Sequence, residues 1–156
     1  KQVIKNFYGD MSEKQFKKAL LKSNLYDLKA KHSLIAILES RLDVCLYRLN
    51  FVKSLYEARQ LISHKHVVVN GSTITSKGYN LSPGDIIHVE KNPAEYLLKE
   101  NTHQQQINKT FNDVIVNHMQ ADFRTMSAIF LEYPKVDEVF FPFIVSLKNI
   151  REFYNI

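Results

Sequence analysis

The chain has 156 residues, of which 45% are hydrophobic and 24% are charged. This length allows one core, or one core with a small inserted module, and it excludes a large multidomain enzyme. Cys45 is the only cysteine, which excludes a disulfide within the chain and a zinc site built on several thiolates. The sequence has no apolar run near the roughly 18 residues that a membrane span needs.

The net charge of +5 and the pI near 9.2 favour a polyanionic partner. The charge is unevenly distributed. Residues 1–38 carry eight Lys against three acids, 39–92 carry seven basic residues against five acids, and 93–156 carry six against eight. We therefore expect the first two segments to meet an anionic ligand. The last should serve packing or protein contact.

A helix is predicted from Met11 to Lys22. Ser12 and Gln15 have the spacing of a capping box, and Met11 can pack on Phe16 as a hydrophobic staple. Lys14, Lys18 and Lys22 recur every four residues on another face and form a basic ridge. A solvated face kept polar for solubility is the alternative interpretation of this ridge.

A second helix is predicted from Ser33 to Leu49. Its buried face would consist of residues three or four apart, which are Leu34, Leu38, Leu42, Cys45 and Leu49. Arg41 and Arg48 lie seven residues apart, which is two turns of a continuous helix. We therefore expect both guanidinium groups to project from one side.

A third helix is predicted to begin at Ser54, where Glu57 completes another capping box. Its buried face would be formed by Leu55, Ala58, Leu61 and Ile62. Arg59, Gln60 and Lys65 should stay largely outside this face.

The pattern becomes extended after His66. Asn70-Gly71 stands between the β-formers 67–69 and 72–74, and this dipeptide favours a two-residue hairpin turn because both central residues need positive φ. Residues 82–85 mark another turn, and 86–89 predict a strand that closes a small sheet. The module should end near Pro93.

The C-terminal part is predicted less sharply. Residues 94–108 are polar with helical character, 128–133 and 140–145 are expected to be strands around a turn at 134–137, and 146–154 is expected to be a short helix. Its aromatic rings are too many to leave in water, so we expect some to pack on Phe16 and Leu20. Asp137 and Glu138 would repel phosphate from this face.

The segment SRLDVCLYRLNFVKSLYEARQLISHKHVVVNGSTITSKGYNLSPGDII, residues 40–87, resembles the RNA-binding domain named after small-subunit ribosomal protein S-four. That resemblance implies two packed helices feeding a small sheet. The flanks NFYGDMSEKQFKK and PFIVSLKNIREFYNI are similar to those of the ribosomal family itself, in its bacterial type and its organellar versions. One departure from the resemblance is that the family usually begins with further residues upstream, sometimes with a cysteine-rich zinc site, and this sequence shows neither.

The resemblance implies an α+β fold in which a mostly helical domain, 1–38 plus 93–156, is interrupted by an RNA-binding module at 39–92. The implied partners are small-subunit rRNA and neighbouring small-subunit ribosomal proteins, with no catalytic site, metal, cofactor, small-molecule substrate or membrane span. The ratio of 16 Lys to 5 Arg, with abundant Asn and Ile, is typical of an A+T-rich coding sequence. We therefore expect a mitochondrial ribosome in the matrix, with a plastid or a bacterial cytoplasm as alternatives.

Structured RNA is recognised mostly through phosphates, 2′-hydroxyls and shape, so its protein surface needs well-placed cations and polar donors. The candidate RNA-binding residues are Lys14, Lys18, Lys22, Arg41, Arg48, Lys53, Ser54, Arg59, Gln60, His64, Lys65, His66, Asn70 and Lys77.

Some of these residues have alternative interpretations. Ser54 could be committed to its helix cap, and Arg41 could pair with Glu39 or Asp43. His64 and His66 could be metal ligands only if Cys45 joined them, and Cys45 is placed on a core face. Tyr56 stands where the family often has a basic or small residue, and it could stack on a base or pack on a neighbouring helix.

Two other function classes share the module. A pseudouridine synthase uses a catalytic aspartate in a motif with Arg-Leu-Asp, which residues 41–43 match by letters, but no remaining segment is long enough for its catalytic domain. A free RNA chaperone or ribosome-rescue factor would lack the ribosomal-type flanks.

Overall fold

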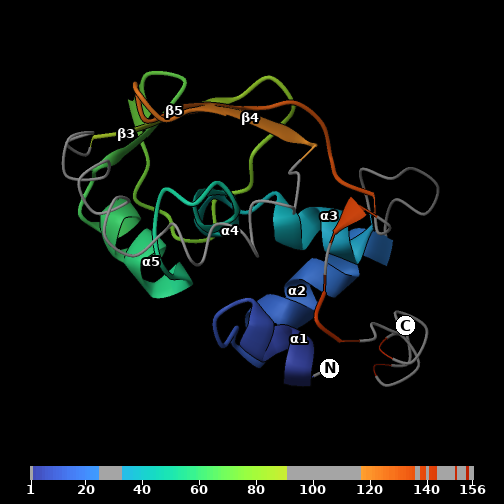
Figure 1. The fold of residues 1–156 in the computed structure, drawn as a ribbon. Coiled ribbons are helices and arrows are strands. Elements are labelled where there is room, and N and C mark those ends of the chain that lie inside the picture. Colours follow the sequence, from blue (N-terminus) through green and yellow to red (C-terminus); the bar gives the residue numbers. More distant parts are fainter. Residues whose placement is uncertain are drawn as a thin grey trace.

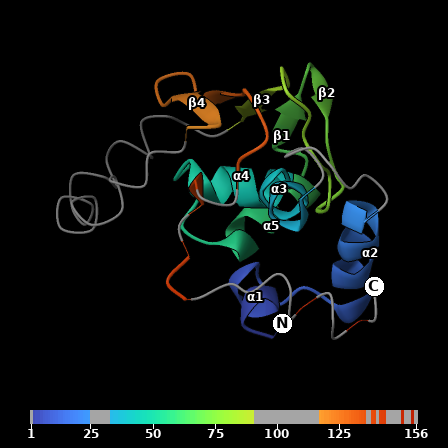
Figure 2. The same cartoon turned by 90° about the vertical axis from the view of Figure 1, so that its right-hand side faces the viewer.

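The computed structural model describes residues 2–24, 33–90, 117–135, 138–139, 141–143, 150 and 154. Its elements are α1 (Gln2–Phe7), α2 (Glu13–Asn24), α3 (Leu34–Glu39), α4 (Leu42–Arg48), α5 (Leu55–Ser63), β1 (Val67–Val69), β2 (Ser72–Thr73), β3 (Ile86–Val89), β4 (Met119–Asp122) and β5 (Ser127–Phe130). The sheet forms one layer and α3 to α5 lie beneath it. α1 lies farthest from the sheet, and α2 lies beside α3 (Figures 1 and 2). This is the expected α+β fold.

The sheet has five antiparallel strands in the order β2-β1-β3-β5-β4. Alternation along β3 buries Ile87 and Val89 and leaves Ile86 and His88 exposed, so one face of the sheet covers the helices. The core below it takes side chains from α4, α5 and all the strands except β2.

The predicted hairpin is confirmed. Asn70 and Gly71 both have positive φ, 50° and 78°, and Val69 pairs with Ser72 across the two-residue turn. The Asn70 side chain also connects this turn to the start of β3. Its amide donates to Asp85 Oδ1 at 2.8 Å, and its carbonyl accepts from the Ile86 backbone N–H at 2.9 Å.

The capping predictions for α2 and α5 are also confirmed, with one difference. Ser12 and Gln15 exchange both capping-box hydrogen bonds at 3.3 Å. Ser54 Oγ accepts from the Glu57 N–H at 3.1 Å, but the Glu57 carboxylate accepts from the N–H of Lys53, one residue before the cap. The start of α5 is therefore fixed by side chains from within its own first turn.

The single helix predicted from Ser33 to Leu49 is wrong, because it is divided into α3 and α4. Arg41 is extended, with φ −68° and ψ 136°. A distant loop satisfies the backbone at the break: the Leu42 N–H donates to the Tyr79 carbonyl, and the Ser40 carbonyl accepts from the Leu81 N–H. The Asn80 amide donates to the Ile37 carbonyl and to Ser40 Oγ. These bonds replace those lost at two helix ends.

The C-terminal predictions need three corrections. The strand expected at 128–133 is β5 and ends at Phe130, β4 was not predicted, and residues 141–143 are not a strand. The helix expected at 94–108 lies outside the described residues. Of the one expected at 146–154, only residues 150 and 154 are described, and both are helical.

A second hydrophobic cluster joins α1, α2 and α3 to the C-terminal rings. Phe141 and Phe143 pack against Phe7, and Tyr154 lies 6.2 Å from Phe16 between ring centroids. The prediction that C-terminal rings pack on N-terminal helices is therefore confirmed for the rings that the structure describes. This cluster also contains Val44 and Leu55, so α4 and α5 contribute to both cores.

The division into 39–92 and a second unit stays a prediction. In the structure, β5 pairs with β3, so residues 119–130 extend the sheet of the module although they lie outside 39–92 in the sequence. None of the described helices is long and apolar enough to cross a membrane.

We predict that a fragment of residues 39–135 unfolds cooperatively and is several kcal/mol more stable than one of 39–92. The shorter fragment lacks the buried Met119, Met126 and Phe130, and burying each such side chain is worth about 1.5–3 kcal/mol. Urea unfolding followed by circular dichroism measures both. Equal midpoints would show that β4 and β5 add nothing to the module's stability.

Candidate nucleic-acid interface

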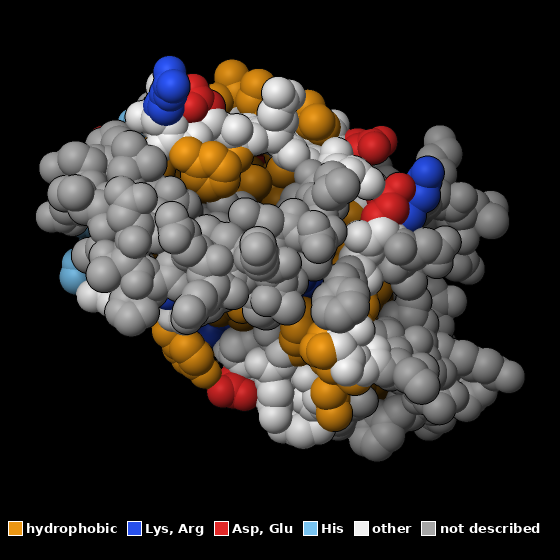
Figure 3. All heavy atoms as spheres, viewed as in Figure 1, with side chains coloured by type: hydrophobic (Ala, Val, Ile, Leu, Met, Phe, Trp, Pro, Cys, Tyr) orange, Lys and Arg blue, Asp and Glu red, His pale blue; other side chains and the backbone are white. Residues whose placement is uncertain are grey.

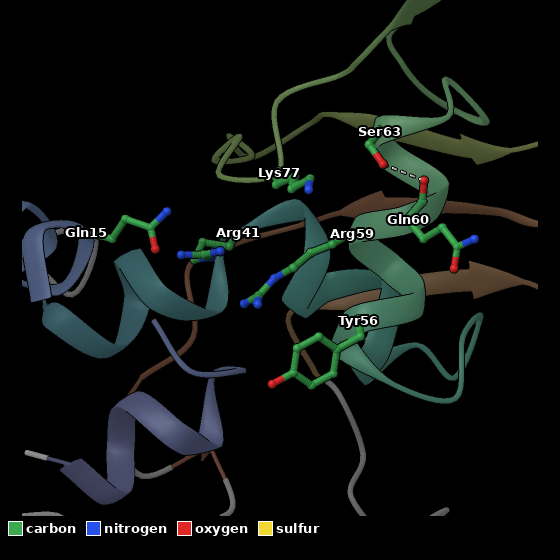
Figure 4. Close-up of a pocket in the computed structure, with 7 residues that line it drawn as sticks. All are labelled: Gln15, Arg41, Tyr56, Arg59, Gln60, Ser63 and Lys77. Atoms are coloured by element: carbon green, nitrogen blue, oxygen red, sulfur yellow. Dashed lines mark hydrogen bonds between the residues drawn. The ribbon is translucent and has the colours of Figure 1, made fainter. Parts of the chain in front are cut away.

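A polar groove of about 470 Å³ lies between α2, the start of α4, α5 and the loop between β2 and β3 (Figure 4). It is lined by Gln15, Arg41, Tyr56, Arg59, Gln60, Ser63 and Lys77. Three of these residues are cationic and none carries a carboxylate. The remaining side chains offer amides, a hydroxyl and one phenol ring, so the groove suits an anionic ligand that also presents hydrogen-bonding groups.

The two arginines of the groove share one buried carboxylate. Asp43 has no solvent exposure, and it accepts two hydrogen bonds from Arg41 at 3.0 and 2.8 Å and one from Arg59 Nε at 2.8 Å. The pairing of Arg41 with Asp43, which the sequence left open, is therefore present. These contacts fix both guanidinium groups at the wall of the groove while their side chains remain 8% and 18% exposed.

Arg59 also holds the turn that follows α1. Its Nη1 donates to the Gly9 carbonyl at 2.6 Å and its Nη2 to the Tyr8 carbonyl at 2.8 Å. Gly9 has φ +72°, and a Cβ there would meet Arg59 Nη2 at 2.8 Å. Only glycine therefore combines this backbone conformation with so close an approach.

Arg48 has a different carboxylate and does not line the groove. It donates to both oxygens of the fully buried Glu39, at 3.0 and 2.8 Å, and lies 5.3 Å from the Phe7 ring centroid. Tyr8 donates to Glu39 at 2.6 Å, and burial raises the pKa of this phenol well above its usual value. The expectation that Arg41 and Arg48 share one face rested on a continuous helix, which is wrong.

The predicted lysine ridge is exposed on α2. Gln15 lines the groove, and residues three and seven positions later share its helical face, so Lys18 and Lys22 lie on the side of α2 that borders the groove. Lys14 lies about one quarter turn further round the helix.

The other candidates lie on α5, next to its two ends, in the hairpin turn and in the loop between β2 and β3. Lys53, Gln60, His64, Lys65, His66, Asn70 and Lys77 are all exposed. His64 and His66 stack with centroids 6.5 Å apart and line a smaller hollow of about 240 Å³ with Glu57, Gln60 and Leu61. Ser54 is committed to its cap.

Gln15 and Ser63 line the groove but were not predicted as site residues. Tyr56 also lines it, and the sequence left open whether it stacks on a base or packs on a neighbouring helix. Tyr56 is 60% exposed, its hydroxyl donates to Asp10 Oδ2 at 2.7 Å, and the Arg59 guanidinium lies over its ring at 5.8 Å. The hydrogen bond to Asp10 raises the pKa of the phenol. The sequence signal for Tyr56 was its position on α5, one residue before Glu57, where the family often has a basic or small residue.

Neither a metal site nor a reactive thiol is evident in the described part of the chain. No group of three or more His, Cys, Asp or Glu side chains there is placed to hold a metal ion. Cys45 is fully buried, and burial raises the pKa of its thiol well above the usual value. Its predicted place on a core face is confirmed.

The face of the molecule seen in Figure 3 differs from the groove. Apolar side chains gather there over the sheet, and few Lys or Arg side chains are visible among the described residues. Ile86, Ile129 and Leu131 are exposed by 40–52%, and Ile86 pairs directly with Ile129. This outer face of the sheet offers apolar contact more than charge.

Comparisons with known proteins agree with this architecture. The family model described as S4 domain matches residues 40–87. Small ribosomal subunit protein uS4m of Reclinomonas americana is 34% identical over 157 residues, which cover 99% of this chain and 62% of that protein. Small ribosomal subunit protein uS4 of Sinorhizobium medicae is 33% identical over 155 residues, and that of Bartonella bacilliformis is 36% identical over 157. In both cases the match covers 99% of this chain and 73% of the relative.

We predict that Asp43→Asn destabilises the fold by about 3–5 kcal/mol, because it leaves two guanidinium groups beside a buried amide without their counter-charge. Chemical denaturation measures the change. The control is Lys135→Ala, which removes an exposed pair of 3.7 Å with Glu138 and should cost at most about 1 kcal/mol. Equal effects of the two substitutions would contradict a central role for Asp43.

Proposed function

Because the chain belongs to the family of small ribosomal subunit protein uS4, we propose that it is a structural component of a small ribosomal subunit, where it binds rRNA and helps the subunit assemble. The observation that carries this proposal is similarity over 99% of the chain, including both flanks of the S4 domain. A free chaperone built on the same module would have no need for these flanks.

The groove and the ridge beside it form the proposed RNA surface. Arg41 and Arg59 are fixed guanidinium groups, while Lys77, Lys18 and Lys22 are exposed point charges on its borders. Fixed guanidinium groups can meet phosphate oxygens with defined geometry, and lysines can adjust to the path of the backbone. Such a surface suits a folded RNA that is recognised by shape and phosphate position.

The outer face of the sheet and the C-terminal part are proposed to contact neighbouring ribosomal proteins. The exposed pair Ile86 and Ile129, with Leu131, forms an apolar surface of the kind found at protein interfaces. Residues 93–156 carry a net charge of −2, which disfavours contact between this segment and RNA phosphates.

We propose a mitochondrial ribosome as the location. The lysine-rich composition and the similarity to a mitochondrial relative support it. The similarity to bacterial relatives is comparable, so a bacterial cytoplasm remains the competing location. Immunolocalisation against a matrix marker decides between the two.

We propose no enzymatic activity. The one motif that matches an RNA-modifying enzyme by letters is Arg41-Leu42-Asp43, and the Asp43 carboxylate has no exposed surface. It already accepts hydrogen bonds from two arginines. A catalytic aspartate must reach its substrate, and this one is covered by the fold.

Salt dependence tests the proposed surface. Six to eight phosphate contacts imply a slope of log affinity against log salt of roughly −5 to −7 for duplex-like RNA. Changing Lys18, Lys22 and Lys77 together to Ala should reduce the magnitude of this slope by roughly 2–3, and these residues are exposed, so the fold should persist. Filter binding with small-subunit rRNA between 50 and 300 mM salt gives the slope.

The control for that experiment is Lys135→Ala, since Lys135 is an exposed lysine remote in sequence from the groove. It should leave the slope unchanged. A wild-type slope near −1 would contradict the surface, and failure of the chain to co-sediment with small subunits at high salt would contradict the ribosomal role.

A further inference from the structure

We propose that the groove binds one unpaired nucleotide of the RNA, with its base stacked on the Tyr56 ring and its phosphate beside Arg41 and Lys77. This inference rests on the proposed function and goes beyond it by naming the RNA element that the groove selects. It concerns Tyr56, an aromatic residue that a surface built only for phosphates would not need.

The Tyr56 ring has the properties of a stacking platform. It is 60% exposed at the mouth of the groove, so much of the ring is available to a ligand. Two contacts hold it in place: the hydrogen bond from its hydroxyl to Asp10 and the Arg59 guanidinium over one face of the ring. The proposed base therefore stacks on the ring face opposite Arg59. A ring that is already ordered loses little conformational freedom when a base stacks on it.

The two ends of the groove differ in charge. Figure 4 shows Tyr56 and Lys77 at opposite ends, with Arg41 and Arg59 between them. The Asp10 carboxylate lies at the Tyr56 end, 2.7 Å from the phenol oxygen, and disfavours phosphate there. Phosphate is therefore favoured toward Lys77 and Arg41, and the uncharged base toward Tyr56.

The dimensions and the polar lining also fit one nucleotide. The volume of about 470 Å³ lies within the roughly 300–1,000 Å³ of pockets that hold small ligands. Gln60 and Ser63 follow Tyr56 by four and seven residues on α5 and line the groove. Ser63 Oγ donates to the Gln60 carbonyl at 2.9 Å, so its oxygen can still accept a hydrogen bond from a base edge or a ribose, whereas the Gln60 amide points away from Arg41 and Arg59 (Figure 4). A base inside a duplex already has both faces stacked, so only an unpaired one can use the ring.

The first experiment uses fluorescence, because the chain has no tryptophan. Tyr56→Trp puts a single reporter in the groove, and Tyr47→Trp puts one at a tyrosine of α4 that does not line it. Each variant of the 156-residue chain is titrated at low salt with five-nucleotide oligoadenylate and with a blunt RNA duplex, and binding is followed separately by anisotropy of labelled RNA. We expect saturable quenching only for Tyr56→Trp with oligoadenylate.

The second experiment measures affinity for oligoadenylate. Tyr56→Ala should weaken it roughly 5- to 150-fold, since stacking on an aromatic ring is lost. Tyr56→Phe keeps the ring but loses the hydrogen bond to Asp10, so it should weaken the affinity much less than Tyr56→Ala. Duplex affinity should change little in either variant. Circular dichroism confirms that the variants are folded, which the exposure of Tyr56 leads us to expect.

Three results would overturn the nucleotide site while leaving the proposed function intact. In the first, the wild-type chain co-sediments with small subunits but does not bind oligoadenylate. In the second, Tyr56→Trp binds oligoadenylate without quenching of its fluorescence, and in the third, Tyr56→Ala binds oligoadenylate with unchanged affinity. A lower melting temperature of Tyr56→Ala at unchanged affinity would assign Tyr56 to anchoring Asp10 instead. Loss of co-sedimentation in the wild-type chain is the separate result that counts against the ribosomal role.

Discussion

The carboxylate of Asp43 is the constraint on which the described structure depends most. A buried charge is tolerated only when it is paired and hydrogen-bonded, and Asp43 meets this requirement with Arg41, Arg59 and the backbone N–H of Val44. Arg41 stands at the break before α4 and Arg59 on α5, so the pairing fixes these two helices. Arg59 then reaches the turn after α1. One carboxylate thus connects three parts of the chain.

A second buried carboxylate repeats this arrangement. Glu39 ends α3 and accepts from Arg48 of α4 and from Tyr8 beyond α1. The N-terminal segment is therefore joined to the module by charged hydrogen bonds as well as by the apolar cluster that shares Val44 and Leu55. Charged contacts of this kind have strict geometry, and they specify how the helices meet more than they add to stability.

This organisation divides the cations into two kinds. The arginines of residues 39–92 are held by the fold, and only the two at Asp43 border the groove, whereas the lysines around it are exposed. A guanidinium group fixed in advance loses little freedom on meeting a phosphate, but part of its charge is already balanced. The net attraction for RNA therefore depends strongly on the lysines, and the position of the bound RNA depends on the arginines and Tyr56.

The sequence by itself determined the features that arise from neighbouring residues: the caps at Ser12 and Ser54, the turn at Asn70-Gly71 and the apolar face of α5. These depend on bonds within one turn, so their spacing is visible in the letters. Three features were decided only by the tertiary structure. The first is the break at Ser40, which requires hydrogen bonds from Asn80 and Leu81. The others are the pairing of β5 with β3, and the contacts of Arg59 with Asp43 and with the turn after α1. These contacts join residues far apart in the chain, and helical periodicity does not encode which buried carboxylate an arginine will meet.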